Sequence, residues 1–202
     1  TGYYNSSITA MESMTLTLNE VKENLTKVDF TKLPKPKKTN KGKRGQLLEL
    51  ALGIANTSKL TDCVDGELKS FTQGESIAVT QLKHVLPQIF ANIPIYRTKL
   101  GIKTQQTLFV GFDRDNNFIG STTLTPESDP KHFEQLEEDF HDICDAILDA
   151  YYDKKELHTV TGRNGLLQIR TKDSKYKGKY HPIIWKGQQL SNKGFAFYLT
   201  GK

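Results

Sequence analysis

Acidic residues and a lysine lie close together in the segment Asp62-Cys-Val-Asp-Gly-Glu67-Leu-Lys69. Glu67 and Lys69 are two residues apart, so on a β-strand both side chains emerge from the same face. Asp62, in the turn just before, can reach the same place. Two neighbouring carboxylates favour a hard cation such as Mg²⁺, and a lysine beside that ion can contact a phosphate or orient an attacking water. The spacing is therefore typical of phosphodiester hydrolysis, with a plain surface charge pair as the alternative.

Two neighbouring segments strengthen the hydrolytic interpretation. Glu49 precedes the acidic segment in an apolar stretch with helical spacing, and would supply a further carboxylate from a second element. The alternative for Glu49 is an ordinary helix residue that faces solvent. Upstream, Lys41 and Gly42 belong to a basic, glycine-containing loop that runs into the start of this helix, where backbone N–H groups favour a phosphate.

The elements that must position these residues follow from the spacing of apolar side chains. Apolar residues at intervals of three and four predict helices over 14–28 and 45–54, and another that opens at Asp129-Pro130 and carries acidic residues to 149. Alternating or apolar runs predict strands from about Gly66 and over 76–81, 107–112, 118–124, 165–171 and 194–200. The sum is a mixed α/β or α+β domain, with a few strands flanked by helices.

The composition limits the class of protein. The chain has 202 residues, of which 36% are hydrophobic, and this balance excludes wholesale disorder, a collagen-like structure or a coiled-coil rod. No apolar run approaches the length of a membrane span, and no signal-peptide pattern opens the sequence, so a cytoplasmic location is expected. Cys63 and Cys144 are too few for a disulfide scaffold or a zinc site. A net charge of +5 mildly favours an anionic partner, against the alternative of a basic protein with no such partner.

Four ordered blocks of the sequence resemble the MutH family of DNA endonucleases, which includes a mismatch-repair nicking enzyme and type II restriction enzymes that cut at GATC. The first is Lys41-Gly42-x-x-Gly45-x-Leu-Leu-Glu49, and the second is the segment from Asp62 to Lys69. The others are the acidic helix that leads into Leu-Gln-Ile-Arg170-Thr-Lys, and Gly-Phe-Ala-Phe-Tyr198-Leu near the end. The resemblance covers about residues 41–199. It implies a restriction-endonuclease-like, PD-(D/E)xK core, in which helices flank a mixed central sheet.

The resemblance also implies the catalytic residues and their metal. The implied catalytic residues are Asp62, Glu67, Lys69, Glu49 and Lys99. Asp62 and Glu67 would hold Mg²⁺, for which Mn²⁺ would substitute. Two assignments stay open, because Lys103 also fits the place of Lys99, and because Asp62 lies closer to Glu67 than in the best-known members, so Asp65 could share the metal.

On the DNA side, the resemblance implies contacts from Lys41, Gly42, Arg170, Thr171, Lys172 and Tyr198. Arg170 takes the place of the arginine that reads a base, and an arginine can grip guanine O6 and N7 in the major groove. Tyr198 takes the place of a tyrosine near the adenine. Thr171 stands where the nicking enzyme has proline, which leaves base specificity open.

The resulting expectation is one endonuclease domain over 1–202, with a helical arm and a basic Pro/Lys loop over 1–40 and the catalytic and recognition core over 41–202. It could form the N-terminal or catalytic part of a longer protein. The expected function is Mg²⁺-dependent cleavage of double-stranded DNA by a type II restriction enzyme at GATC or a related site, through a homodimer or a second domain and without a membrane partner. The alternatives are a methyl-sensitive nicking endonuclease of mismatch repair and a DNA-binding domain that does not cleave.

Overall fold

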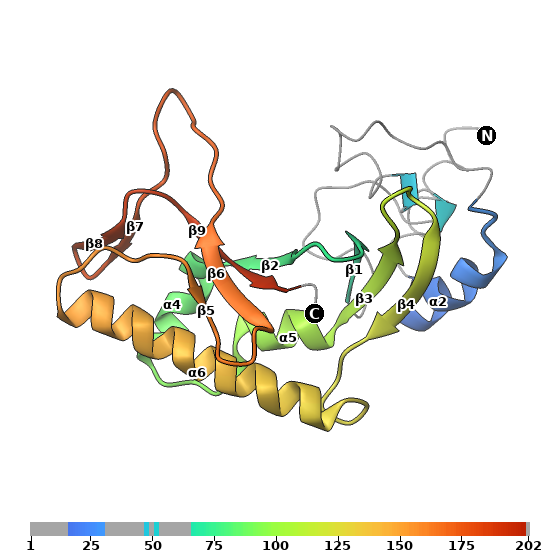
Figure 1. The fold of residues 1–202 in the computed structure, drawn as a ribbon, viewed down its shortest axis with the longest axis horizontal. Helices are drawn as coiled ribbons and strands as arrows, with labels where there is room; N and C mark the ends of the chain where they lie inside the picture. The colour runs from blue at the N-terminus through green and yellow to red at the C-terminus, as the bar shows by residue number, and fades with distance from the viewer. Residues whose placement is uncertain (1–15, 31–46, 49–50, 53–65, 201–202) are drawn as a thin grey trace, which may run out of the picture. The chain divides into compact units, whose positions relative to one another are not determined.

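The computed structural model describes residues 16–30, 47–48, 51–52 and 66–200, which fall into two compact units (Figure 1). The first unit contains the described residues up to Gln73 together with Gln106–Leu124. The second contains Gly74–Gln105 and the described residues from Thr125 onward. Each unit has its own sheet and is described by itself.

A mixed three-stranded sheet forms the first unit. Its order is β1 (Glu67–Thr72), β3 (Thr107–Phe112) and β4 (Phe118–Thr123), with β1 parallel and β4 antiparallel to β3. The helix α2 (Leu18–Lys27) begins at Thr17, whose hydroxyl accepts a hydrogen bond from the Glu20 N–H at 3.2 Å. One face of the sheet packs with α2 in a core made of Val21, Leu25, Leu48, Leu52, Leu68, Leu108, Val110 and Phe112.

An antiparallel sheet forms the centre of the second unit. Its order is β2 (Ile77–Gln81), β9 (Phe195–Leu199), β6 (Leu167–Thr171) and β5 (Val160–Thr161). The helices of this unit are α4 (Leu82–Phe90), the short 3₁₀ helix η1 (Ile95–Arg97), α5 (Lys99–Gln105) and α6 (Pro130–Tyr152). A separate hairpin joins β7 (Ile183–Trp185) to β8 (Gln188–Ser191).

The long helix α6 covers one face of this sheet. Its buried stripe contains Phe133, Leu136, Phe140, Ile143 and Ile147, the residues expected from the helical spacing. The Phe140 ring lies 6.2 Å from that of Phe197 on β9, which identifies the face that is covered. Asp129 stands at the N-cap as expected, but its side chain does not cap the helix and instead accepts a hydrogen bond from the Ser128 hydroxyl.

The mixed α+β class predicted from the sequence is confirmed, as are α2, α6, β1, β2, the β3–β4 hairpin, β6 and β9. The helix expected over 45–54 is described only at residues 47, 48, 51 and 52, of which the first three are helical. The helices α4 and α5 and the strands β5, β7 and β8 were not predicted. Within the described ranges, no helix is long and apolar enough to cross a membrane.

Candidate catalytic strand and nucleic-acid interface

Strand β1 presents Glu67 and Lys69 on one face. Leu68 between them is 6% exposed and belongs to the core against α2, so the strand alternation places Glu67 and Lys69 on the opposite face. Both side chains are half-buried. The strand begins where the Glu67 N–H donates to the Gln106 carbonyl at 2.8 Å, beside Gly66, at which any Cβ would overlap that carbonyl. The expected carboxylate–lysine spacing on a strand is thus present.

The remaining members of the expected catalytic and metal set cannot be placed beside this strand. Asp62, its alternative Asp65, and Glu49 lie outside the described residues, as do Lys41 and Gly42 of the basic loop. Within the described part of the chain, no cluster of three or more His, Cys, Asp or Glu side chains could hold a metal ion. A Mg²⁺ site that includes Glu67 would therefore need a carboxylate from outside the described residues, such as Asp62 or its alternative Asp65.

Lys99 and Lys103 lie one turn apart on α5, in the second unit. Lys99 is exposed at the first residue of the helix, where its N–H donates to the Gln88 side chain at 2.9 Å, and Lys103 is half-buried. The pKa of His84 on α4 is lowered, first by partial burial and then by the positive charges of Lys83, Lys99 and Lys103. The two lysines therefore contribute to one cationic neighbourhood, and the choice between them stays open.

Arg170 and Tyr198, which are far apart in the sequence, are in direct contact. The guanidinium carbon of Arg170 on β6 lies 3.9 Å from the centre of the Tyr198 ring on β9, a close cation–π stack. The strand register pairs Arg170 with Ala196 and Gln168 with Tyr198, so arginine and tyrosine are diagonal neighbours. The small Ala196 opposite Arg170 leaves room for the guanidinium to lie over the ring.

This pair lies on the face of the sheet that α6 does not cover. Phe197, which contacts α6, alternates with Tyr198 along β9, so the two side chains point to opposite faces. On this face Arg170 is half-buried and Tyr198 is buried, with 8% of its surface exposed. Gln168 on the same face donates a hydrogen bond to the Thr161 hydroxyl at 2.8 Å. The Arg170–Tyr198 stack thus lies beside a second pair of contacting side chains, Gln168 and Thr161, on the same face of the sheet.

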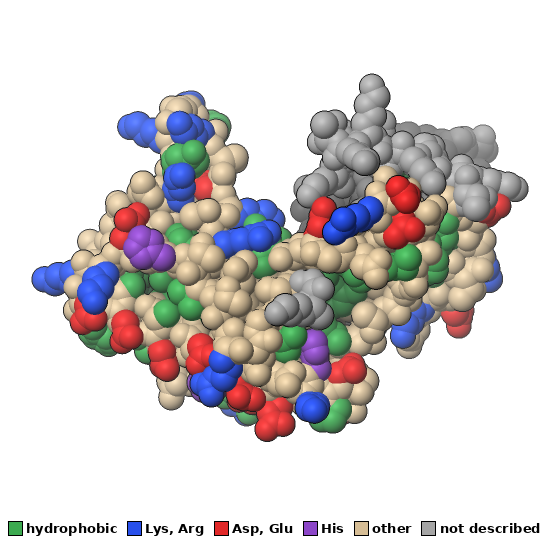
Figure 2. All heavy atoms as spheres, viewed as in Figure 1, with side chains coloured by type: hydrophobic (Ala, Val, Ile, Leu, Met, Phe, Trp, Pro, Cys, Tyr) green, Lys and Arg blue, Asp and Glu red, His purple; other side chains and the backbone are tan. Residues whose placement is uncertain are grey.

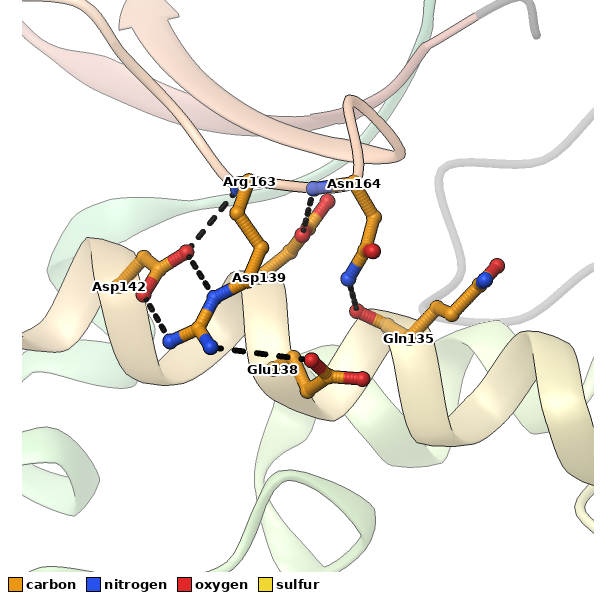
Figure 3. A network of polar contacts seen from close by, with 6 residues as sticks. All are labelled: Gln135, Glu138, Asp139, Asp142, Arg163 and Asn164. Carbon is orange, nitrogen blue, oxygen red and sulfur yellow. Dashed lines mark hydrogen bonds and ion pairs between the residues drawn. The ribbon is translucent and has the colours of Figure 1, made fainter.

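The entry into β6 is held by buried Asp139 of α6 (Figure 3). Asp139 is fully buried, and one carboxylate oxygen accepts from the Asn164 N–H at 2.7 Å. The other oxygen accepts from the N–H groups of Leu166 and Leu167 at 2.8 and 3.0 Å. A Cβ at Gly162 would overlap the Asp139 side chain, so glycine is required there. Asp139 thereby sets the position of the turn between β5 and β6.

Arg163 makes a second tie between the same turn and α6 (Figure 3). Its guanidinium donates two hydrogen bonds to Asp142, at 3.0 and 2.6 Å, and its backbone N–H donates a third at 3.0 Å. Glu138 lies 3.8 Å from the same guanidinium. The side-chain hydrogen bonds and then the backbone bond lower the pKa of Asp142 from 3.8 to about 2.

Beyond Arg170, Thr171 ends β6 with an exposed side chain, and the Lys172 N–H donates to the Gly194 carbonyl at 2.8 Å. Asp173 follows with a side chain that is only 6% exposed. It accepts hydrogen bonds from the N–H groups of His181 and Gly194, at 2.7 and 2.9 Å, and pairs with His181 Nδ1 at 2.8 Å. These interactions lower the pKa of Asp173 well below its usual range, with the His181 side chain as the largest cause.

Two acidic residues that position this region, Asp139 and Asp173, were not identified from the sequence. Asp139 occurs three residues after Leu136 and four before Ile143, so helical spacing alone places it on the buried stripe. Asp173 carries a weaker signal, since it is a single acid within a lysine-rich segment.

Comparisons with known proteins leave the family open. No protein-family model matches the chain, and no curated protein matches its sequence.

Proposed function

We propose that the chain is a Mg²⁺-dependent, sequence-specific DNA endonuclease of the MutH type that acts as a type II restriction enzyme at GATC or a related site. The observation that carries the proposal is the contact between Arg170 and Tyr198, the two residues that the family resemblance assigns to base recognition. A stacked guanidinium keeps its planar edge available for bidentate hydrogen bonds to guanine. Four ordered sequence blocks support the same function, as does the position of this pair on the sheet face opposite the one that α6 covers.

In the proposed active site, Glu67 and Asp62 would hold Mg²⁺, which when bound supplies charge for the scissile phosphate and an activated water. Lys69 lies on the same face of β1 as Glu67, so its ammonium group would contact the phosphate or orient the attacking water. The further lysine that the resemblance assigns to catalysis, Lys99 or Lys103, lies on α5 of the second unit. The proposal includes a restriction-endonuclease-like fold, in which the mixed sheet of the first unit would be the catalytic sheet.

The test is cleavage of a plasmid that contains GATC sites, in Mg²⁺ and separately in Mn²⁺, with adenine-methylated and unmethylated DNA. Discrete fragments with defined ends are expected, and comparison of the two substrates gives the methylation rule. Lys69→Ala should reduce the cleavage rate by roughly a hundredfold or more, since a positioned catalytic group contributes that much. Its DNA affinity should change little. Lys22→Ala, which removes an exposed lysine from α2, is the matched control.

The alternatives give different results in the same assay. Nicked circles without linear product would favour the mismatch-repair type of nicking enzyme. Sequence-specific binding without cleavage in either metal would favour a DNA-binding domain. A chain that neither cuts the plasmid nor binds double-stranded DNA would contradict the proposal and both alternatives.

A further inference from the structure

A basic hairpin, defined as residues 172–181, projects from the end of β6 in the second unit (Figure 1). Tyr176 and Lys179 exchange two backbone hydrogen bonds, at 2.9 and 3.1 Å, and form its tip. The two residues between them, Lys177 and Gly178, have φ angles of 51° and 78°. Positive φ at both positions is typical of a type I′ turn, which matches the twist of a two-stranded hairpin. The lysine-rich segment thus has a defined shape.

The hairpin displays positive charge without a compensating surface acid. Its lysines are all exposed: Lys172, Lys175, Lys177 and Lys179. None of them takes part in the ion pairs found among the described residues. The one acid of the segment, Asp173, is turned inward and paired with His181 and two N–H groups. Figure 2 shows basic side chains along this projection, which in residues 172–181 are all lysines.

Aromatic rings lie beside two lysines of the hairpin and beside the nearby Lys193. Lys175 and Lys193 lie 5.2 and 4.6 Å from the centre of the Tyr180 ring, and Lys177 lies 5.5 Å from that of Tyr176. Tyr176 itself is 67% exposed. An isolated two-stranded hairpin is only marginally stable in water. Here the hydrogen bonds of Asp173 to His181 and Gly194 hold the base of the hairpin in place. Such bonds are expected where the position of the hairpin is important, and a loop that only faces solvent does not need them.

A hollow of about 520 Å³ opens at the base of the hairpin. Its lining includes the cationic side chains of Lys83 and Lys172 and the polar side chains of Gln81 and Ser174. It also includes Asp173 and His181, which are paired with each other at 2.8 Å. Gln81 pairs with Ala196, which in turn pairs with Arg170, so the hollow adjoins the strands that carry the Arg170–Tyr198 stack. Cationic and hydrogen-bonding side chains around an open space suit a phosphate group.

We propose that the basic hairpin and the hollow at its base are a second DNA contact, which binds the phosphate backbone beside the bases read by Arg170. Lys172 and Lys175 lie two and five residues beyond Arg170, or roughly 7 and 17 Å along an extended chain. The major groove is about 12 Å wide, so phosphates flank a base-reading side chain at comparable distances. The inference rests on the proposed function, because it takes Arg170 as the residue that enters the groove.

The test compares the salt dependence of DNA binding in two triple variants. Binding to a fluorescent 30-base-pair duplex with a central GATC is measured by polarisation, without divalent metal, over a series of salt concentrations. The hairpin variant is Lys175→Ala/Lys177→Ala/Lys179→Ala. The control, Lys131→Ala/Lys154→Ala/Lys155→Ala, removes three exposed lysines, one from the first turn of α6 and two from just beyond its last residue. Thermal unfolding of each variant shows whether it remains folded.

The slope of log affinity against log salt falls by about 0.9 for each phosphate contact that is lost. We expect the slope of the hairpin variant to be smaller in magnitude by roughly 2 to 3, with the control unchanged. Equal slopes for the folded hairpin variant and the wild-type chain would overturn the second contact while leaving the proposed endonuclease intact. If the wild-type chain neither binds this duplex nor cuts the plasmid in Mg²⁺ or Mn²⁺, both proposals are overturned.

Discussion

Removal of the Asp139 carboxylate should strongly destabilise the second unit. Asp139→Ala would leave the N–H groups of Asn164, Leu166 and Leu167 without their acceptor. An unpaired buried N–H costs about 1–3 kcal/mol, so three give an upper range of about 3–9 kcal/mol. Water can reach the half-buried Asn164, and the variant no longer buries a carboxylate, which lowers the cost. We expect a loss of about 3–4 kcal/mol in the free energy of unfolding.

Asp139→Asn should cost less, because its amide oxygen can still accept from Leu166 and Leu167 while its NH₂ group faces the Asn164 N–H. A loss of about 2–3 kcal/mol is expected, because both the Asn164 N–H and the introduced NH₂ group are left without an acceptor. Urea denaturation followed by circular dichroism measures both losses. Asp145→Ala, at an exposed position of the same helix, controls for the change in side chain and should stay within about 0.5 kcal/mol of wild type. An Asp139→Ala loss below about 1 kcal/mol would refute the assignment of the carboxylate as the acceptor that holds this turn.

Three further predictions concern the interface, a thiol and the acid response. Arg170→Lys keeps the charge but loses the planar fork, so discrimination between GATC and a one-base variant should fall roughly ten- to a hundredfold in cleavage assays; unchanged discrimination would contradict base reading. Burial raises the pKa of the Cys144 thiol to about 12, so in a Cys63→Ser background the native chain should react with a thiol reagent much more slowly than the unfolded chain; equal rates would contradict the burial of this thiol. The pKa of Asp142 is lowered to about 2, so its pairing with Arg163 stabilises the fold above pH 3.8, and this stabilisation is lost as the pH falls toward 2. Arg163→Ala should therefore reduce the fall in the urea midpoint between these pH values. An equal fall in the variant would exclude the Asp142–Arg163 pair as the cause of the acid response.

The elements with clear periodicity could be predicted from the sequence, because burial on one face dictates the spacing of apolar residues. The stripe of α6 and the runs of β3 and β9 are examples. Helix α4 was missed because it follows β2 without a break in sequence pattern and contains Pro87, which is unfavourable in most helix interiors. The basic hairpin has no apolar repeat, since its shape depends on a turn and on one buried acid.

The candidate site also has one part that could be predicted from the sequence and another that could not. That Glu67 and Lys69 share one face of a strand follows from their spacing, and the structure confirms it. The stacking of Arg170 on Tyr198 depends on the register between β6 and β9, which no local pattern determines. The expected meeting of Asp62 and Glu67 stays a prediction, because Asp62 lies outside the described residues.

The parallel pairing of β1 with β3 has a consequence for how the chain folds. Between these strands the chain leaves the first unit at Gln73 and re-enters it at Gln106, after passing through Gly74–Gln105 of the second. If that excursion is still a flexible loop, joining its ends costs about 3 kcal/mol of chain entropy. Because this cost is met before the strands pair, parallel pairing of this kind is slow. Prior folding of α4 and α5 would shorten the effective loop. Substitutions that weaken those helices should therefore slow formation of the β1–β3 sheet, although they lie outside the unit that contains it.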